Sequence, residues 1–396
     1  MKKRWAAWAV AAAVFGWVVW HGTHRVTAPT PLTFQGVGSA ESLSLSPDGT
    51  LLAVASRTGQ TAVFDTATGI QKLILPVKSA RMTFSQDGRR LLFVSHSSPS
   101  ARNGTIQIWD TQTGMSLSQF IVPVAPPGAT LSAQPHVAAL SADLHWAAVR
   151  DPGHCSVYDL ATGRRVKLLP APSSRAGNVL FSHDGRLLAV GSDAAPGGLQ
   201  LWDTQTWLPL NVPDVKVGPV HSVRFSPDGT RVAAVNSSGL SWWNTRPWKR
   251  LGGFRVPKAL GEEVGYIYFA SDSRHLLVTR IGPSDSVFVV DCATARVTTT
   301  LPDQMVETTS RVGGRATTVL LSRPSQMLFY RETHVVWDVM QGKELYRIAI
   351  PPSPSAHEVS TLGGDWQWHT TALSADGHVF AAGGYDDGII HVWRLP

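Results

Sequence analysis

The chain has 396 residues, of which 43% are hydrophobic and 16% are charged. This composition is too apolar for a disordered protein, and the 35 glycines follow no collagen period. Two cysteines in the whole chain exclude a disulfide framework, a CxxC redox pair and a cysteine zinc cage. The formal net charge is +7, but four of the basic residues lie within residues 1–25, which contain no acidic residue. The charge is therefore weak evidence for nucleic-acid binding.

Residues 1–25 predict a signal anchor. A basic MKKR start precedes an uninterrupted apolar run from Trp5 to Trp20, the arrangement that sends the following chain across a membrane. As a helix, the run spans about 24 Å, which is short of a hydrocarbon core but longer than the core of most cleaved signals. The small-x-small triplet Val26–Ala28 is followed by Pro29, which disfavours cleavage. We therefore expect an uncleaved transmembrane helix, with a cleaved peptide as the alternative.

Residues 26–30 are then a linker, and residues 31–396 form one domain on the extracytoplasmic side of a bacterial-type cytoplasmic membrane. Within this domain, one unit recurs eight times with a period of about 46 residues, which suits a propeller blade. Each copy carries a Ser-x-Asp-Gly-like turn, and its acid is kept in seven copies: Asp48, Asp87, Asp143, Asp184, Asp228, Asp272 and Asp376. The copy at Ser322–Ser325 lacks the acid.

Two further markers follow in each copy. An apolar strand ends on an aromatic or aliphatic residue and a polar one, as in Trp109-Asp110 and Trp202-Asp203. The first seven copies then run through a T-x-T-G-like turn and a last strand to a proline: Pro76, Pro123, Pro170, Pro213, Pro257, Pro302 and Pro351. Proline has no N–H, so it suits a position where the ladder stops or faces water.

These markers predict one four-stranded antiparallel sheet per copy. In the fifth copy, the expected strands are Val223–Phe225, Arg231–Val235, Leu240–Trp243 and Gly252–Val256. A lone sheet cannot bury both faces, whereas eight sheets in a ring do. The eighth copy lacks a fourth strand, and Leu32-Thr33-Phe34 is expected to supply it and close the ring. The predicted fold is an all-β, eight-bladed propeller, with seven blades as the alternative.

The SPDG turns, the Trp-Asp strand ends and the DTxTG turns together resemble the WD40 repeat family, over residues 31–396. The Gly-His that precedes each WD40 repeat is absent, so the His-Asp-Trp hydrogen-bond network of that family does not carry over. TolB-like and YVTN-type propellers of the periplasm share SPDG without this histidine. The resemblance implies a propeller whose blades pack through their strand-end tryptophans, and Trp146 is expected in the same core.

Partner-binding residues are predicted in two places. The loop Pro351–Trp368 is long and irregular, and Asp365, Trp366, Trp368 and His369 suit an interaction hot spot; capping of the eighth blade is the alternative. Trp207 and Trp248 occupy the turn position held by Gly69, Gly114 and Gly163 in other copies. They are expected on one rim as an aromatic and basic patch, with ordinary turn packing as the alternative.

Histidines at one repeat position carry a chemical hypothesis. His136, His221 and His369 start the innermost strands of their copies, and Glu41 holds this place in the first copy. They are expected at one mouth of the central channel, either around a metal or polar ligand or as solvated rim residues. Because the four copies are spread around the ring, we expect the second outcome, with no metal and no cofactor.

The sequence thus favours a monomeric, non-catalytic scaffold, tethered to the membrane, for protein partners on the face that carries the long loops. One alternative is a lactonase-like or hydrolase-like propeller enzyme using the channel-mouth histidines and Glu41. The other is a small-ligand or glycan receptor using Trp366 and Trp368. Nucleic acid is not an expected partner.

Overall fold

A computed structural model describes the chain from residue 28 to residue 395, with several gaps. The residues outside this description are 1–27, 37, 78–80, 97–102, 124–135, 152, 172–178, 192–197, 212–219, 237–238, 255–262, 271, 282–285, 303, 311–318, 325–332, 339–342, 351–368, 375–376, 385–386 and 396. The regular structure of the described part is entirely β, in 31 strands.

The strands form antiparallel sheets that follow one another in chain order, and the described residues give seven sheets of four strands and one of three. Sheets one to four contain β2 (Ala40–Leu45), β3 (Leu51–Ser56), β4 (Thr61–Asp65) and β5 (Gln71–Leu75); β6 (Arg81–Phe84), β7 (Arg90–His96), β8 (Asn103–Asp110) and β9 (Ser116–Pro123); β10 (His136–Leu140), β11 (Trp146–Asp151), β12 (Gly153–Asp159) and β13 (Arg165–Ala171); and β14 (Val179–Phe181), β15 (Leu187–Gly191) and β16 (Leu199–Asp203).

Sheets five to eight continue the series. They contain β17 (Val220–Phe225), β18 (Arg231–Asn236), β19 (Gly239–Thr245) and β20 (Trp248–Phe254); β21 (Glu263–Phe269), β22 (His275–Ile281), β23 (Ser286–Asp291) and β24 (Arg296–Pro302); β25 (Gln304–Ser310), β26 (Val319–Pro324), β27 (Thr333–Asp338) and β28 (Lys343–Ala349); and β29 (His369–Leu373), β30 (Val379–Gly384) and β31 (Ile389–Arg394), joined by the N-terminal strand β1 (Leu32–Gln35).

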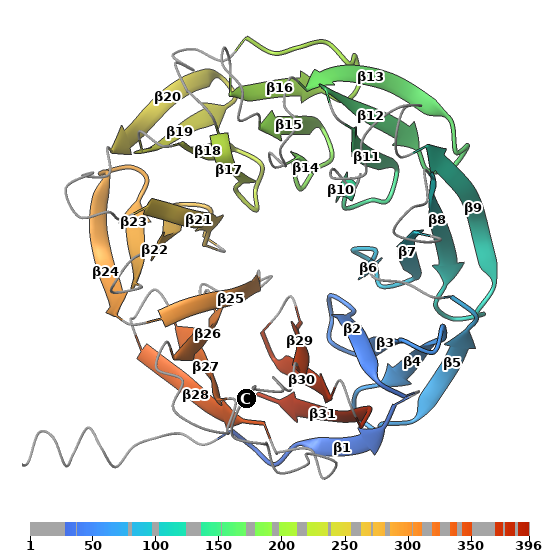
Figure 1. Cartoon of the computed structure of the whole chain (residues 1–396). Helices are drawn as coiled ribbons and strands as arrows, with labels where there is room; N and C mark the ends of the chain where they lie inside the picture. Colours follow the sequence, from blue (N-terminus) through green and yellow to red (C-terminus); the bar gives the residue numbers. More distant parts are fainter. Residues whose placement is uncertain are drawn as a thin grey trace, which may run out of the picture.

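The sheets are arranged around a central axis in the manner of propeller blades (Figure 1). The first strand of each sheet lies nearest the axis and the last strand lies outside. Innermost strands of successive sheets contact each other, as β2 and β6, β10 and β14, and β17 and β21 do. The repeated unit read from the sequence is therefore one sheet.

The N-terminal strand closes the series, as predicted. β1 pairs antiparallel with β31, with Thr33 opposite His391 and Phe34 opposite Ile390. The Thr33 hydroxyl lies 3.0 Å from Nδ1 of His391. Sheet eight thus takes its outer strand from the start of the domain, and the last and first sheets are held together by the backbone itself.

The core lies between neighbouring sheets. Val54, Phe64 and Leu52 of sheet one pack with Ile390 and Val392 of sheet eight in one buried cluster. Strands such as β3 and β30 are buried almost continuously along their length, because each sheet has a neighbour on both faces. The strand-end tryptophans are part of this packing: Trp202, Trp243 and Trp393 are buried, and Trp109 is half-buried.

The Ser-x-Asp-Gly turns are built by side chains. In sheet one, Oδ1 of Asp48 accepts the hydroxyl of Ser46 at 2.6 Å and the N–H of Thr50 at 3.1 Å. Gly49 then takes a φ of 68°, in the left-handed region. The same turn forms at Leu144 and Ser273, with φ of 53° and 58°, so the carboxylate network holds this conformation even without glycine.

Two expected elements differ in the structure. Ser322–Pro324 belong to strand β26 instead of a turn, and the residues that join β25 to β26 lie outside the described chain. Sheet four has three strands, and its expected fourth strand is reduced to a bridge between Trp202 and Pro209. Proline cannot donate to the ladder, although Leu210 still donates its N–H to Leu201 at 2.8 Å.

The predicted signal anchor, residues 1–25, and the first two linker residues lie outside the described residues. In the part of the chain that the structure describes, no helix has the length and apolar character needed to cross a membrane. Ala28, near the end of the predicted linker, packs against the buried cluster of Ile348 and Trp393.

Candidate functional site

The predicted site residues are only partly within the described chain. Asp365, Trp366 and Trp368 lie outside it, and His369 is the first residue of β29, opposite Gly384. Along the backbone, His136, His221 and Glu41 stand at the start of the innermost strands β10, β17 and β2, as expected. Among the described side chains, no group of three or more His, Cys, Asp or Glu could hold a metal ion.

Trp207 and Trp248 both follow the third strand of their sheets, but their backbone settings differ. Trp207 lies in the turn after β16 with a φ of 55°, as the glycine positions of the other copies do. Trp248 is instead the first residue of β20, paired with Thr245. It packs on the core between sheets four and five, against the cluster that contains Trp243, whereas Trp207 packs on the cluster between sheets three and four. That the two side chains share one rim as an aromatic and basic patch stays a prediction.

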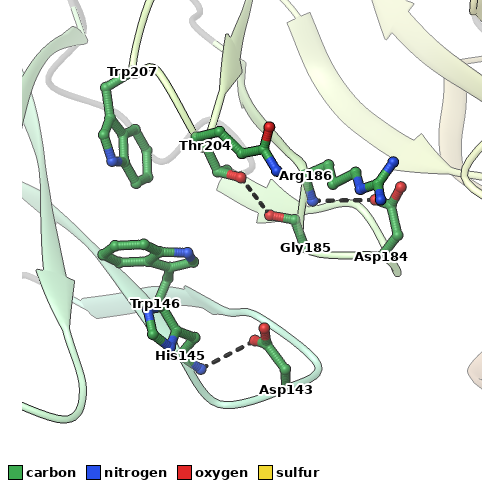
Figure 2. A pocket seen from close by; sticks show the side chains of 9 residues that line it. Asp143, His145, Trp146, Asp184, Gly185, Arg186, Thr204 and Trp207 are labelled. Atoms are coloured by element: carbon green, nitrogen blue, oxygen red, sulfur yellow. Dashed lines mark hydrogen bonds between the residues drawn. The ribbon is translucent and has the colours of Figure 1, made fainter.

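Trp207 forms one wall of a cleft between sheets three and four. Its ring meets that of Trp146 edge to face, with centroids 5.3 Å apart and planes at 89°. Trp146 in turn contacts the ring of His145, 4.5 Å away. The cleft has a volume of about 560 Å³. Figure 2 shows the two indoles on one side, and the remaining lining residues are Asp143, His145, Asp184, Gly185, Arg186, Thr204 and Gln205.

The turn that carries Trp207 is fixed by its own hydrogen bonds. Oδ1 of Asp203 accepts the N–H groups of Gln205 and Thr206, at 3.0 and 2.8 Å. These bonds, the N–H of Thr206 foremost, lower the pKa of Asp203. The Thr204 hydroxyl donates to the carbonyl of Gly185 at 2.7 Å, which ties this turn to the Ser-x-Asp-Gly turn of the same sheet. The aromatic wall therefore stands on a rigid base.

Glycine at this position in sheets one to three permits close approach to the preceding sheet. A Cβ at Gly69 would lie 2.9 Å from Phe34 of β1, and one at Gly163 would lie 3.0 Å from Phe120 of β9. Sheet four carries an indole at this place instead, and the residue accepts an unfavourable left-handed backbone. This substitution places a large aromatic side chain where sheets one to three have none.

Two carboxylates also line the cleft: Asp143 lies in the turn that leads into Trp146 on sheet three, and Asp184 lies in the corresponding turn of sheet four (Figure 2). Oδ1 of Asp143 accepts the hydroxyl of Ser141 at 2.5 Å, and Oδ1 of Asp184 accepts that of Ser182 at 2.6 Å. Neither Oδ2 atom accepts a hydrogen bond from a described residue. Arg186, which is exposed, is the one arginine among the lining residues, and His145 adds an imidazole. The lining of the cleft thus combines aromatic rings with charged side chains.

The sequence singled out Trp207 but missed the cleft. Trp146, expected in the core, is half-buried and forms the second aromatic wall. The cleft also lies among the short turns, whereas partners were expected at the long loops. Most of those loops, including residues 124–135 and 351–368, are outside the described residues, so their role stays a prediction.

Outer strands add a second exposed surface. Large apolar side chains project from the last strands of successive sheets and from the turns before them. These are Ile70, Ile74, Met115, Leu117, Ile121, Val166, Leu168, Leu208 and Val297, each at least 40% exposed. All but Val297, which lies on sheet six, are on the outside of sheets one to four.

Comparison with known proteins gives no relative. No protein-family model matches the chain, and no curated protein matches it. The resemblance to WD40, TolB-like and YVTN-type propellers therefore depends on the repeated turns and strand ends of this chain alone.

Proposed function

We propose that the protein is a WD40-like, eight-bladed β-propeller that acts as a non-catalytic scaffold for protein partners. Residues 1–25 tether it as a monomer to the extracytoplasmic side of a bacterial-type cytoplasmic membrane. The sheets in series and the closing strand β1 support the propeller. The basic start and the apolar run that follows it support the tether.

The cleft beside Trp207 carries the proposal of partner binding. Its two indoles offer a large, stiff contact area, which is typical of interaction hot spots. The exposed apolar side chains on the outer strands offer further surface of the kind that protein interfaces use. Both features stand on a framework held by paired strands and side-chain-locked turns, so little ordering is needed on binding.

A photo-crosslinking experiment tests this proposal. Gln205 is exposed and lines the cleft, and Gln112 holds the same place in the Asp-Thr-Gln-Thr turn of sheet two. We expect benzoylphenylalanine at position 205, introduced into the full chain in its own membrane, to give a discrete protein adduct. The matched probe at position 112 should give none.

When the chain with the probe at position 205 also carries Trp207→Gly, the adduct should disappear. A smear of equal intensity at both positions, or no adduct at all, would contradict partner binding at the cleft. Turnover of a hydrolase substrate panel that His221→Ala abolishes would favour the enzyme alternative instead.

A further inference from the structure

We infer that the cleft between sheets three and four binds an arginine side chain presented by an extended peptide. This inference rests on the proposed function, because it names the chemistry by which the scaffold recognises a partner. The elements of the cleft that carry it are the indoles of Trp146 and Trp207 and the carboxylates of Asp143 and Asp184.

The indoles suit a planar cation. Trp207 meets Trp146 edge to face, so the two rings present surfaces at a right angle to each other. Both side chains are half-buried, which leaves part of each ring in contact with solvent. A guanidinium stacks on such a face, and its aliphatic stem covers the adjoining apolar surface.

The carboxylates supply the complementary charge. In each of Asp143 and Asp184 the turn uses Oδ1, which accepts both a serine hydroxyl and a backbone N–H, and Oδ2 is left for a ligand. Gly185 lies beside Asp143, and a Cβ there would come within 3.6 Å of Oδ2. A guanidinium has five N–H donors in a fork, so it can donate to more than one carboxylate oxygen.

The effect of removing Arg186 tests whether the ligand is a cation or an anion. It belongs to the lining, and its guanidinium makes no ion pair within 4.0 Å among the described residues. The lining therefore contains two carboxylates and one guanidinium. If the ligand is a cation, Arg186 repels it, and removing Arg186 strengthens binding. If the ligand were an anion, Arg186 would hold it, and removing Arg186 would weaken binding.

The test uses the full chain in detergent micelles, labelled with 5-fluorotryptophan. Fluorine resonances of Trp146 and Trp207 are assigned by Trp146→Phe and Trp207→Phe. The probes are the capped tripeptides Gly-Arg-Gly, Gly-Lys-Gly, Gly-Gln-Gly and Gly-Glu-Gly. We expect the arginine peptide alone to shift both resonances with saturation.

Charge variants then test each part of the cleft. Asparagine keeps the Oδ1 acceptor that the turn needs and removes the charge. Asp143→Asn and Asp184→Asn should therefore each lower the affinity for the arginine peptide about fivefold. Arg186→Gln should raise the affinity for the arginine peptide by a similar factor. Asp87→Asn changes the same turn in sheet two, away from the cleft, and should leave the affinity unchanged.

Four results would overturn the inference: no saturable shift, equal binding of the lysine peptide, preferential binding of the glutamate peptide, or weaker arginine binding in Arg186→Gln. The outcome is separable from that of the crosslinking experiment. A protein adduct at position 205 together with no arginine binding removes this inference and keeps the scaffold. Arginine binding without any adduct removes the scaffold and keeps the site.

Discussion

At the scale of single residues, the tryptophans divide into packing residues and surface residues. Trp243 is fully buried between sheets four and five, so Trp243→Ala should lower the free energy of unfolding by about 3–5 kcal/mol. Trp207→Gly loses the ring contact with Trp146 and a part of the packing between sheets three and four but relieves a left-handed backbone, so it should cost clearly less stability than Trp243→Ala. Denaturant titration measures the change in the free energy of unfolding for both variants. Comparable losses would contradict the assignment of Trp207 to the cleft.

Asp291 is a residue whose charge contributes to the pH dependence of folding. Burial opposes its ionisation, but the N–H groups of Thr294 and Ala293 and the guanidinium of Arg274 outweigh it and lower its pKa from 3.8 to about 2. A carboxylate with a lowered pKa stabilises the fold above about pH 4, and this stability is lost as the pH falls toward 2.

We therefore expect the unfolding free energy to decrease between about pH 4 and pH 2, and to decrease less in Asp291→Asn. Denaturant midpoints measured across this range check the prediction. An identical slope in the variant and the natural protein would show that Asp291 does not contribute.

At the scale of elements, the turns explain how much the sequence could predict. The Ser-x-Asp-Gly carboxylates of sheets one to six hold turns where the repeat placed them, because each turn is made by residues adjacent in the chain. Where this chemistry is missing, at Ser322–Ser325, the predicted turn failed. In sheet five, Trp248 begins strand β20 instead of lying in the turn, and no residue of the repeat indicates this difference.

The cleft was beyond sequence reasoning for a different reason. Trp146 and Trp207 are 61 positions apart on different sheets, and their contact depends on how two sheets pack. The signal that was present is the replacement of a turn glycine by Trp207. It marked the right residue but not its neighbours.

At the scale of the whole molecule, the account depends on closure of the ring by β1. Sheet eight borrows its outer strand from the start of the domain, and the cluster of Ala40, Val54, Ala381 and Val392 continues the core across this junction. Closure leaves no sheet without a neighbour on either face. It also links the predicted membrane tether directly to the outer strand of sheet eight.

Disulfide trapping across this junction tests closure most directly. Thr33 lies opposite His391, whereas Ile389 is opposite Gln35, two residues away on the same strand. Facing residues of antiparallel strands reach disulfide distance, and diagonal ones do not. The native Cys155 and Cys292 are buried, and burial raises the pKa of Cys292 to about 12, so neither competes. Mild oxidation should join Thr33→Cys to His391→Cys within one chain, as seen by mass spectrometry, and should not join Thr33→Cys to Ile389→Cys. Equal trapping of both pairs, or bonds only between chains, would contradict a ring closed by β1.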